Sequence, residues 1–483
     1  MEQFVFFALL YSVGLMLGLQ FYRKVPLGFI VLTAFFWGVL IWVILAIVLC
    51  SLAFPFTFRL MASIETLIVI GLAVIFLRKN RGNIQRVELL ILLAAIFLFL
   101  LATALVIRFN SANLTNDSYF IILFGQIIAY IGFYNSSILT PNAFGIFIPV
   151  VHSAAPFLNL DYLYAFQPLF SVLFLGAMFY LINYTLLKIT QNVIYAFFLS
   201  ALGMFFFAST PGVLYYIFYI HTNFSAASYL FLSIVTFWLG QRDDNHTWFI
   251  FSALGLLAFA LVRTETPIFA LMVLAFMAKY LHYRNRLTIL MPLVLVIIVW
   301  QCVGLFLFPE NQDAIVSGSQ TILVISCYSI FALFLLFSKY KIVEKFITSY
   351  IPHYLFAGSI FGAITLFVAE PEHMFLSSTN VLKNLFQTGG WGVTWAIVFF
   401  LIVFSYSLPR LKHEEVFLSN IIIFFVFILA LGFFRGDTFG PYHARWTDSA
   451  NRMSLHILPL SIFYLTIKYG QIAEKRVHLR SGE

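Results

Sequence analysis

The feature that most constrains this chain is a series of continuous apolar runs, each followed by a short polar segment. The hydrocarbon core of a bilayer is about 30 Å thick, which an α-helix crosses with about 20 apolar residues. Only helices and closed barrels satisfy every backbone hydrogen bond there. Barrel strands alternate in hydropathy over about ten residues, and these runs do not alternate. The sequence therefore predicts an all-α polytopic membrane protein.

Composition agrees with this class, because 62% of the 483 residues are hydrophobic and only 10% are charged. Soluble domains carry about 25% charged residues. We predict about fifteen transmembrane helices (range about 12–15) from the lengths of the apolar runs. The predicted spans cover residues 3–21, 26–53, 60–77, 87–107, 160–187, 192–208, 224–240, 247–262, 267–283, 287–308, 320–337, 347–368, 391–408, 416–434 and 454–470.

The positions of the cations predict the orientation of these helices. Lys and Arg gather in cytoplasmic loops, so the net charge of +8 is interpreted as a topology signal, and no nucleic-acid partner is expected. If the N-terminus lies outside, the short inner loops and the C-terminal tail hold all but seven of the 27 Lys and Arg. The expected location is the plasma or inner membrane, with a cytoplasmic C-terminus. The outer seven are Arg59, Arg108, Arg263, Lys383, Arg435, Arg445 and Arg452.

The loops on the predicted outer face are long and chemically mixed, which favours function there. Loops longer than about 12–15 residues in a compact domain are usually functional or disordered. Two apolar stretches, 120–135 and 208–223, are too short to cross and are predicted to be amphipathic juxtamembrane helices. We divide the chain into an N-terminal transmembrane module (1–86), a core with external loop 108–159 (87–300), and C-terminal helices with external loops 369–390 and 435–453 (301–483).

A single carboxylate, Asp117, interrupts the apolar chain in the stretch "RFNSANLTNDSYF". Asp or Ser at this point is typical of an N-cap, which satisfies free backbone N–H groups of the following helix. The other interpretation is a general base near the membrane surface, with its pKa raised by the neighbouring Tyr119 and Phe120. The residues alone leave both interpretations open.

Two further polar groups lie at the ends of predicted spans. His221 and Asn223, in "FYIHTNFSAASYL", either cap a helix or donate hydrogen bonds to substrate hydroxyls or phosphate. Arg263 and Glu265, in "FALVRTETPIFAL", stand between two apolar runs with almost no loop. Charges at this depth must pair or line a wet cavity. Arg263 and Glu265 therefore form either a structural ion pair or a site in which Arg263 binds phosphate, whose oxygens match the guanidinium fork.

The densest polar segment of the chain is "FFRGDTFGPYHARWTDSANRMSLHILPL". Asp448 or Ser449 would cap the last predicted span. Arg452 and His456 are four residues apart and share one helical face. This face should point into the protein rather than to lipid. Arg452 is therefore interpreted as a cation site for an anionic substrate, with a side chain that snorkels to the membrane surface as the alternative.

Several other signals are absent or weak. Glu370, Glu372 and His373 suit a solvated loop better than a metal site, because their spacing matches no standard ligand motif. The sequence contains no P-loop or dinucleotide-binding motif, so it gives no support to ATP-driven transport. The cysteines lie inside apolar runs and are interpreted as small buried hydrophobes; they are Cys50, Cys302 and Cys327.

Together these segments resemble the GT-C superfamily of membrane glycosyltransferases, in its bacterial polyprenyl-phosphate-sugar-dependent type. The resemblance rests on an external loop with an acid followed by juxtamembrane helices. It also rests on "HTNFSAASYLFL", "LVRTETPIF" and "DSANRMSLHILPL", the last similar to an "NR…H…P" signature before the final span. It covers roughly residues 87–470. Four spans precede the loop where many relatives have one, so the first three are expected to be an added module. The paired acids of many relatives here read Asn116–Asp117.

The resemblance implies a GT-C-like fold and the transfer of a sugar from a polyprenyl-phosphate donor to a glycan, lipid or protein acceptor of the cell envelope. Asp117 would deprotonate the acceptor hydroxyl for an inverting attack on the extracytoplasmic face. Arg263 and Arg452 would bind the donor phosphate. No cofactor is required and no metal site is expected. The supporting residues would be Asn116, His221, Asn223, Glu265, Asp448, Asn451 and His456.

Two alternatives remain open at this stage. A flippase or transporter for lipid-linked saccharides would also need intramembrane Arg residues and aromatic grooves, but it would not need long loops on one face. A polymerase or ligase of the O-antigen type would use similar Arg chemistry on lipid-diphosphate-linked oligosaccharides. Membrane lipids are expected partners in every case.

Overall fold

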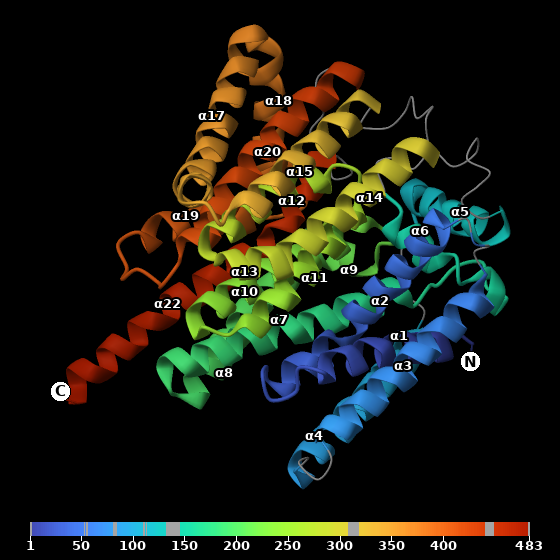
Figure 1. The fold of residues 1–483 in the computed structure, drawn as a ribbon. Helices are drawn as coiled ribbons and strands as arrows, with labels where there is room; N and C mark the ends of the chain where they lie inside the picture. The colour runs from blue at the N-terminus through green and yellow to red at the C-terminus, as the bar shows by residue number, and fades with distance from the viewer. Residues whose placement is uncertain are drawn as a thin grey trace.

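A computed structural model describes residues 2–52, 54, 57–80, 85–109, 112, 114–131, 145–307, 318–439 and 449–481 of the chain. Within these residues all regular secondary structure is helical, and the helices lie side by side in an elongated bundle (Figure 1). This confirms the all-α class. The Asn116, Arg435 and Asp437 side chains and the whole of His443, Arg445 and Asp448 lie outside the described part.

Each predicted apolar range overlaps one long helix. These helices are α1 (Glu2–Leu19), α2 (Leu27–Ser51), α3 (Phe58–Asn80), α4 (Arg86–Phe109), α7 (Phe166–Thr190), α8 (Val193–Ala208), α10 (Thr222–Asp243), α11 (His246–Val262), α12 (Thr266–Tyr280), α14 (Met291–Leu307), α15 (Gly318–Phe337), α17 (Ile351–Ala369), α19 (Thr394–Ser405), α20 (Glu415–Phe439) and α22 (Leu458–Ser481). The shorter helices are α5 (Asn116–Ile131), α6 (Phe147–His152), α9 (Pro211–Phe218), α13 (Tyr283–Asn285), α16 (Lys341–Lys345), α18 (Pro371–Lys383) and α21 (Ser449–Met453).

Not all of these helices have the length that a membrane span needs. In the described part, eight are long and apolar enough to cross a bilayer by themselves, or nine if α8 and α9, which meet at a bend of 76°, form one broken span. Several others, such as α11, α12 and α19, are apolar but shorter than 18 residues. The chain therefore has the helices of a membrane protein, and the count of about fifteen spans stays a prediction.

The segment 369–390, predicted as an external loop, is instead mostly helical. α18 begins with Pro371 in its first turn, where the missing N–H is not needed, and it extends to Lys383 before a π-helical turn. Its buried residues Met374, Ser377 and Val381 follow helical spacing against α20. The segment is therefore an amphipathic helix whose apolar face packs on α20. Its polar composition alone did not indicate this.

The helix at the centre of the fold is α10, and its position determines where the candidate residues lie. Every residue from Thr222 to Gly240 is buried, and α10 contacts α7, α11, α20 and α22. This buried stretch also contains small polar residues, and the Ser228 and Thr236 hydroxyls donate to the helix's own Phe224 and Leu232 carbonyls. The chain reaches its N-terminus through α9 and leaves through α11. The α11–α12 corner and the short helix α21 return to the same end of α10, near α5 (Figure 1).

Candidate functional site

Asp117 lies in the first turn of α5, one residue after the helix begins. The hydroxyl of Ser118 accepts a hydrogen bond from the Thr115 N–H at 3.2 Å and donates to the Ile220 carbonyl at 3.0 Å. These bonds fasten the start of α5 to the segment between α9 and α10. The Asp117 carboxylate bonds to other elements instead of capping its own helix, so the N-cap interpretation of this residue is wrong.

Tyr219, in the link between α9 and α10, is the main contact of Asp117 that the sequence did not single out. Its hydroxyl donates to Asp117 Oδ2 at 3.0 Å and accepts from Thr115 Oγ1 at 2.8 Å. Arg452 Nη1 donates to the Tyr219 hydroxyl oxygen at 3.4 Å. Burial raises the pKa of Tyr219, an effect that the charge of Arg452 partly offsets. The phenol therefore stays protonated and can donate a hydrogen bond to the carboxylate.

Arg452 in α21 completes the contacts of Asp117, with its Nη1 bonded to Asp117 Oδ2. The side chain is 9% exposed, compared with 30% for Asp117. Burial disfavours its charge, but the carboxylate of Asp117 more than compensates, and the pKa of Arg452 is raised. The guanidinium thus bonds to a side chain of the protein, and its depth relative to the membrane surface stays a prediction. We name Asp117, Tyr219 and Arg452 the surface cluster.

His221 connects the surface cluster to a second group of polar side chains. It is the N-cap of α10, and its Nδ1 accepts from the Asn223 backbone N–H at 3.2 Å. A neutral ring that accepts at Nδ1 carries its proton on Nε2, and Nε2 lies 3.8 Å from Asp117 Oδ2. Burial, followed by the charges of Arg452 and Arg263, lowers the pKa of His221 well below its usual range. The ring is therefore neutral and both caps a helix and faces the acid.

The α11–α12 corner holds Arg263 and Glu265 almost fully buried, at 3% and 1% exposure. Arg263 is the C-cap residue of α11, Glu265 is the N-cap residue of α12, and Pro267 follows in the first turn. Arg263 Nε donates to Glu265 Oε1 at 2.5 Å. Arg263 Nη1 donates to Thr222 Oγ1 at 3.2 Å. The structural ion pair is thus present, and direct binding of phosphate by Arg263 stays a prediction.

Asn223 joins these groups into one hydrogen-bonded network. Its Oδ1 accepts from Arg263 Nη1 at 3.0 Å and lies 3.2 Å from His456 Nε2. Its Nδ2 lies 2.8 Å from His221 Nδ1. All of these side chains are buried, so each bond also removes the cost of burying a polar atom. We name His221, Asn223, Arg263, Glu265 and His456 the buried network.

Among the remaining predicted residues, the structure describes the side chain of Asn451, which bonds to residues outside the surface cluster and the buried network. Asn451 accepts from Trp391 Nε1 at 2.6 Å and donates to the Gly389 carbonyl at 2.9 Å, contacts that fasten α21 to the segment before α19. Asp448 and the side chain of Asn116 lie outside the described residues. Across the described part of the chain, no three His, Cys, Asp or Glu side chains gather closely enough to hold a metal ion.

The site combines a partly exposed ion pair, Asp117 with Arg452, and the buried network behind it. The carboxylate of Asp117 is the most exposed charged group in the surface cluster, and Arg452 and Tyr219 bond to the same oxygen. Behind them, the charges of Arg263 and Glu265 balance each other inside the fold. Such a site can accept a proton at Asp117 and bind an anion at Arg452.

Comparison of the chain with family models, with characterised proteins and with solved structures gave no match.

Proposed function

We propose that this protein is a membrane glycosyltransferase that moves a sugar from a polyprenyl-phosphate donor to an acceptor hydroxyl of a cell-envelope glycan, lipid or protein. In this proposal the fold is GT-C-like, with about fifteen spans, and the reaction takes place at the extracytoplasmic face of the plasma or inner membrane. The observation that carries the proposal is the contact between Asp117 and Arg452, which are 335 residues apart in the chain.

The proposed reaction needs a base and a group that stabilises the departing phosphate. The acceptor oxygen attacks the anomeric carbon while Asp117 takes its proton. The bond from the anomeric carbon to the phosphate oxygen breaks, and its electron pair leaves with the polyprenyl phosphate. Attack from the opposite side inverts the anomeric centre. Arg452 supports this step because a fixed cation at the departing oxygens stabilises the charge that develops there.

The contacts of the surface cluster suggest the order in which these groups act. Without a ligand, Asp117 and Arg452 neutralise each other, so neither is available. The donor phosphate, esterified to both the lipid and the sugar, carries one negative charge as the carboxylate does, and its two free oxygens match the guanidinium fork. When it takes the place of Asp117 on Arg452, it releases the carboxylate to accept the proton. Donor binding would thus activate the base, with Tyr219 and His221 keeping it in place and Arg263 stabilising the network behind them.

The test measures release of polyprenyl phosphate from a panel of polyprenyl-phosphate hexoses and pentoses, in membranes that contain the protein. We expect Asp117→Asn to lower the rate by at least about 10²-fold, in the range for loss of a general base, and Arg452→Gln to lower it by a similar factor, as for a lost charge-stabilising donor. Asp161→Asn and Arg108→Gln are the matched controls, because both side chains are exposed.

The result would speak against the proposal if the Asp117→Asn protein, folded and inserted normally, released polyprenyl phosphate at the unaltered rate. Equal losses in the control variants would also count against it. If membranes without the protein released polyprenyl phosphate at the same rate, the measured activity would not belong to this protein.

A further inference from the structure

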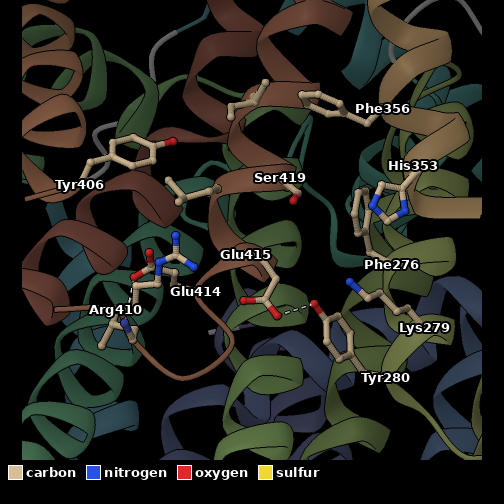
Figure 2. A pocket seen from close by; sticks show the side chains of 13 residues that line it. Phe276, Lys279, Tyr280, His353, Phe356, Tyr406, Arg410, Glu414, Glu415 and Ser419 are labelled. Atoms are coloured by element: carbon tan, nitrogen blue, oxygen red, sulfur yellow. Dashed lines mark hydrogen bonds between the residues drawn. The ribbon is translucent and has the colours of Figure 1, made fainter. Parts of the chain in front are cut away.

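A second polar site lies away from the residues described so far, in a cavity of about 420 Å³. It is formed by the last turns of α12, the first half of α17, and the connection from α19 into α20 (Figure 2). Its volume is within the usual range for a small-molecule pocket. Figure 2 shows the charged side chains of Arg410, Glu414, Glu415 and Lys279 towards one end of the pocket and Phe356 and Tyr406 towards the other.

This pocket lies at the opposite end of α12 from the candidate functional site. Glu265, which belongs to the buried network, is the N-cap residue of α12, whereas Lys279 and Tyr280 form its last turn. A helix of 15 residues is about 22 Å long. If the buried network lies near one face of a bilayer, the pocket lies towards the other face.

The charges of the pocket leave an excess of cations. Glu414 is neutralised by an ion pair with Lys468 and by the Leu411 backbone N–H at 2.8 Å. Glu415 accepts a hydrogen bond from the Tyr280 hydroxyl at 2.8 Å (Figure 2).

Lys279 and Arg410 form no ion pair with a carboxylate in the part of the chain that the structure describes, and together with the single negative charge of Glu415 they leave a net charge of +1 around the pocket. Lys279 Nζ instead lies 5.0 Å from the centre of the Tyr280 ring. Two cations beside a cavity favour an anionic ligand, and Arg in particular matches a phosphate.

The apolar side of the pocket continues along α17. Phe356 lines the cavity, and Ile360, Ile364 and Val368 follow it at intervals of four residues, which places them on one helical face. All four side chains are exposed, from 37% at Phe356 to 73% at Val368. An apolar stripe that starts at a cationic pocket matches a ligand with a charged head and a long hydrocarbon tail.

We propose that this pocket binds the phosphate headgroup of an anionic membrane lipid, held by Lys279 and Arg410, with the lipid tail along the Phe356–Val368 stripe of α17. Basic pockets between transmembrane helices are suited to such headgroups. A soluble phosphate compound would use the cations but not the stripe. The proposal is independent of the sugar transfer suggested above, because it uses none of the same residues.

The experiment titrates the purified full-length protein in detergent with phosphatidylglycerol and counts bound lipids by native mass spectrometry. A basic residue near the membrane surface contributes about fivefold to the affinity for anionic lipid. We therefore expect Lys279→Gln with Arg410→Gln to weaken binding by about 25-fold. The variant counts as folded if its elution volume in size-exclusion chromatography and its thermal transition match those of the unaltered protein.

The matched control is Lys339→Gln with Arg284→Gln. Both side chains are exposed, neither lines the pocket, and Lys339 lies over Tyr340 at 5.1 Å, much as Lys279 lies over Tyr280. This control should bind phosphatidylglycerol like the unaltered protein. Unchanged binding in the pocket variant, an equal loss in the control, or equal affinity for phosphatidylcholine would overturn the proposal. So would full competition by glycerol 1-phosphate, which would assign the pocket to a soluble ligand.

Discussion

Asp117 Oδ2 is the atom on which the contacts of the surface cluster converge. It accepts from a phenol and a guanidinium, and the His221 ring lies just beyond hydrogen-bonding distance. Hydrogen bonds to a charged acceptor are stronger than those between neutral groups, so these partners hold the carboxylate in one orientation. The position of this oxygen is therefore determined by residues from two separate parts of the chain, the α9–α10 link and α21.

Tyr219→Phe tests how much the phenol contributes to that orientation. The change removes the O–H that donates to Asp117 and leaves the ring in place. A hydrogen bond to a charged group contributes about 1.5–3 kcal/mol, so we expect turnover in the polyprenyl-phosphate assay to fall by at least about tenfold. Tyr119→Phe should have no effect, because that side chain is 60% exposed. A rate for Tyr219→Phe equal to that of Tyr119→Phe would exclude the phenol from the reaction.

His221 gives folding stability a dependence on pH. Its pKa in the folded protein lies well below the ordinary value because of burial and the neighbouring Arg charges. As pH falls below about 6.5, the unfolded chain binds a proton at this residue that the folded chain does not. Folding stability therefore falls with falling pH, by up to about 1.4 kcal/mol per pH unit for this group.

His221→Asn should reduce this dependence, because Asn keeps an acceptor at the N-cap and does not titrate. The measurement is the free energy of unfolding in detergent at pH 7.5 and at pH 5.0. The loss between the two should be smaller in the variant than in the unaltered protein. His246→Asn is the control, since His246 is exposed. If both variants lose the same stability as the unaltered protein, His221 is not the titrating group.

The contact between helices α1 and α2 shows how closely the elements approach. A Cβ atom on Gly38 would lie 1.7 Å from the Leu10 carbonyl oxygen, and one on Gly14 would lie 1.8 Å from the Ala34 carbonyl oxygen. Small residues allow such an approach between helices in a membrane, where packing replaces the hydrophobic effect as the driving force. Backbone atoms cannot move aside in the way that a flexible side chain can.

Gly38→Ala should therefore force α1 and α2 apart. Overpacking of this kind costs about 1–3 kcal/mol, so we expect a lower thermal transition of the purified protein. Gly71→Ala in α3 is the matched control, because no atom lies within 4 Å of its added Cβ. This control should be neutral or slightly stabilising, since Ala favours the helix. Equal transitions for the two variants would show that the α1–α2 contact is looser than described.

At the scale of the whole molecule, the two polar sites lie at opposite ends of α12. The buried network is at the N-terminal ends of α10 and α12, and the lipid pocket is at the C-terminal end of α12. The cations outside the site mostly belong to the predicted inner loops. This distribution leads to the expectation that the surface cluster faces the outside and the pocket faces the cytoplasm.

Cysteine labelling tests this orientation, after each natural cysteine is replaced by serine. Tyr119 lies beside Asp117 and is 60% exposed, and Lys339 is exposed near the other end of the helices. A cysteine introduced by Tyr119→Cys should react with an impermeant reagent in intact cells. One introduced by Lys339→Cys should react only after the membrane is permeabilised. The reverse pattern would invert the topology and move the proposed reaction to the cytoplasm.

The sequence by itself determined the helical class and the position of each long helix. The reason is physical: a bilayer requires local backbone hydrogen bonds and continuous apolar runs, and both can be read residue by residue. The pairing of Arg263 with Glu265 was also foreseeable, since two buried charges two residues apart must neutralise each other. The helical fold of 371–383 was not foreseen, because the polar residues at its start, Glu370, Glu372 and His373, are typical of a solvated loop.

Only the tertiary structure decided which distant residues meet. Asp117 contacts Arg452 across 335 residues and Tyr219 across 102, and these contacts exist because α5, α9 and α21 all pack near the N-terminus of α10. Nothing local distinguishes Tyr219 from Tyr215 or Tyr216 in the same stretch. From the sequence, Asp117 could be either a helix cap or a general base. The packing of helices around α10 places Tyr219 and Arg452 against its carboxylate, and this excludes the capping role.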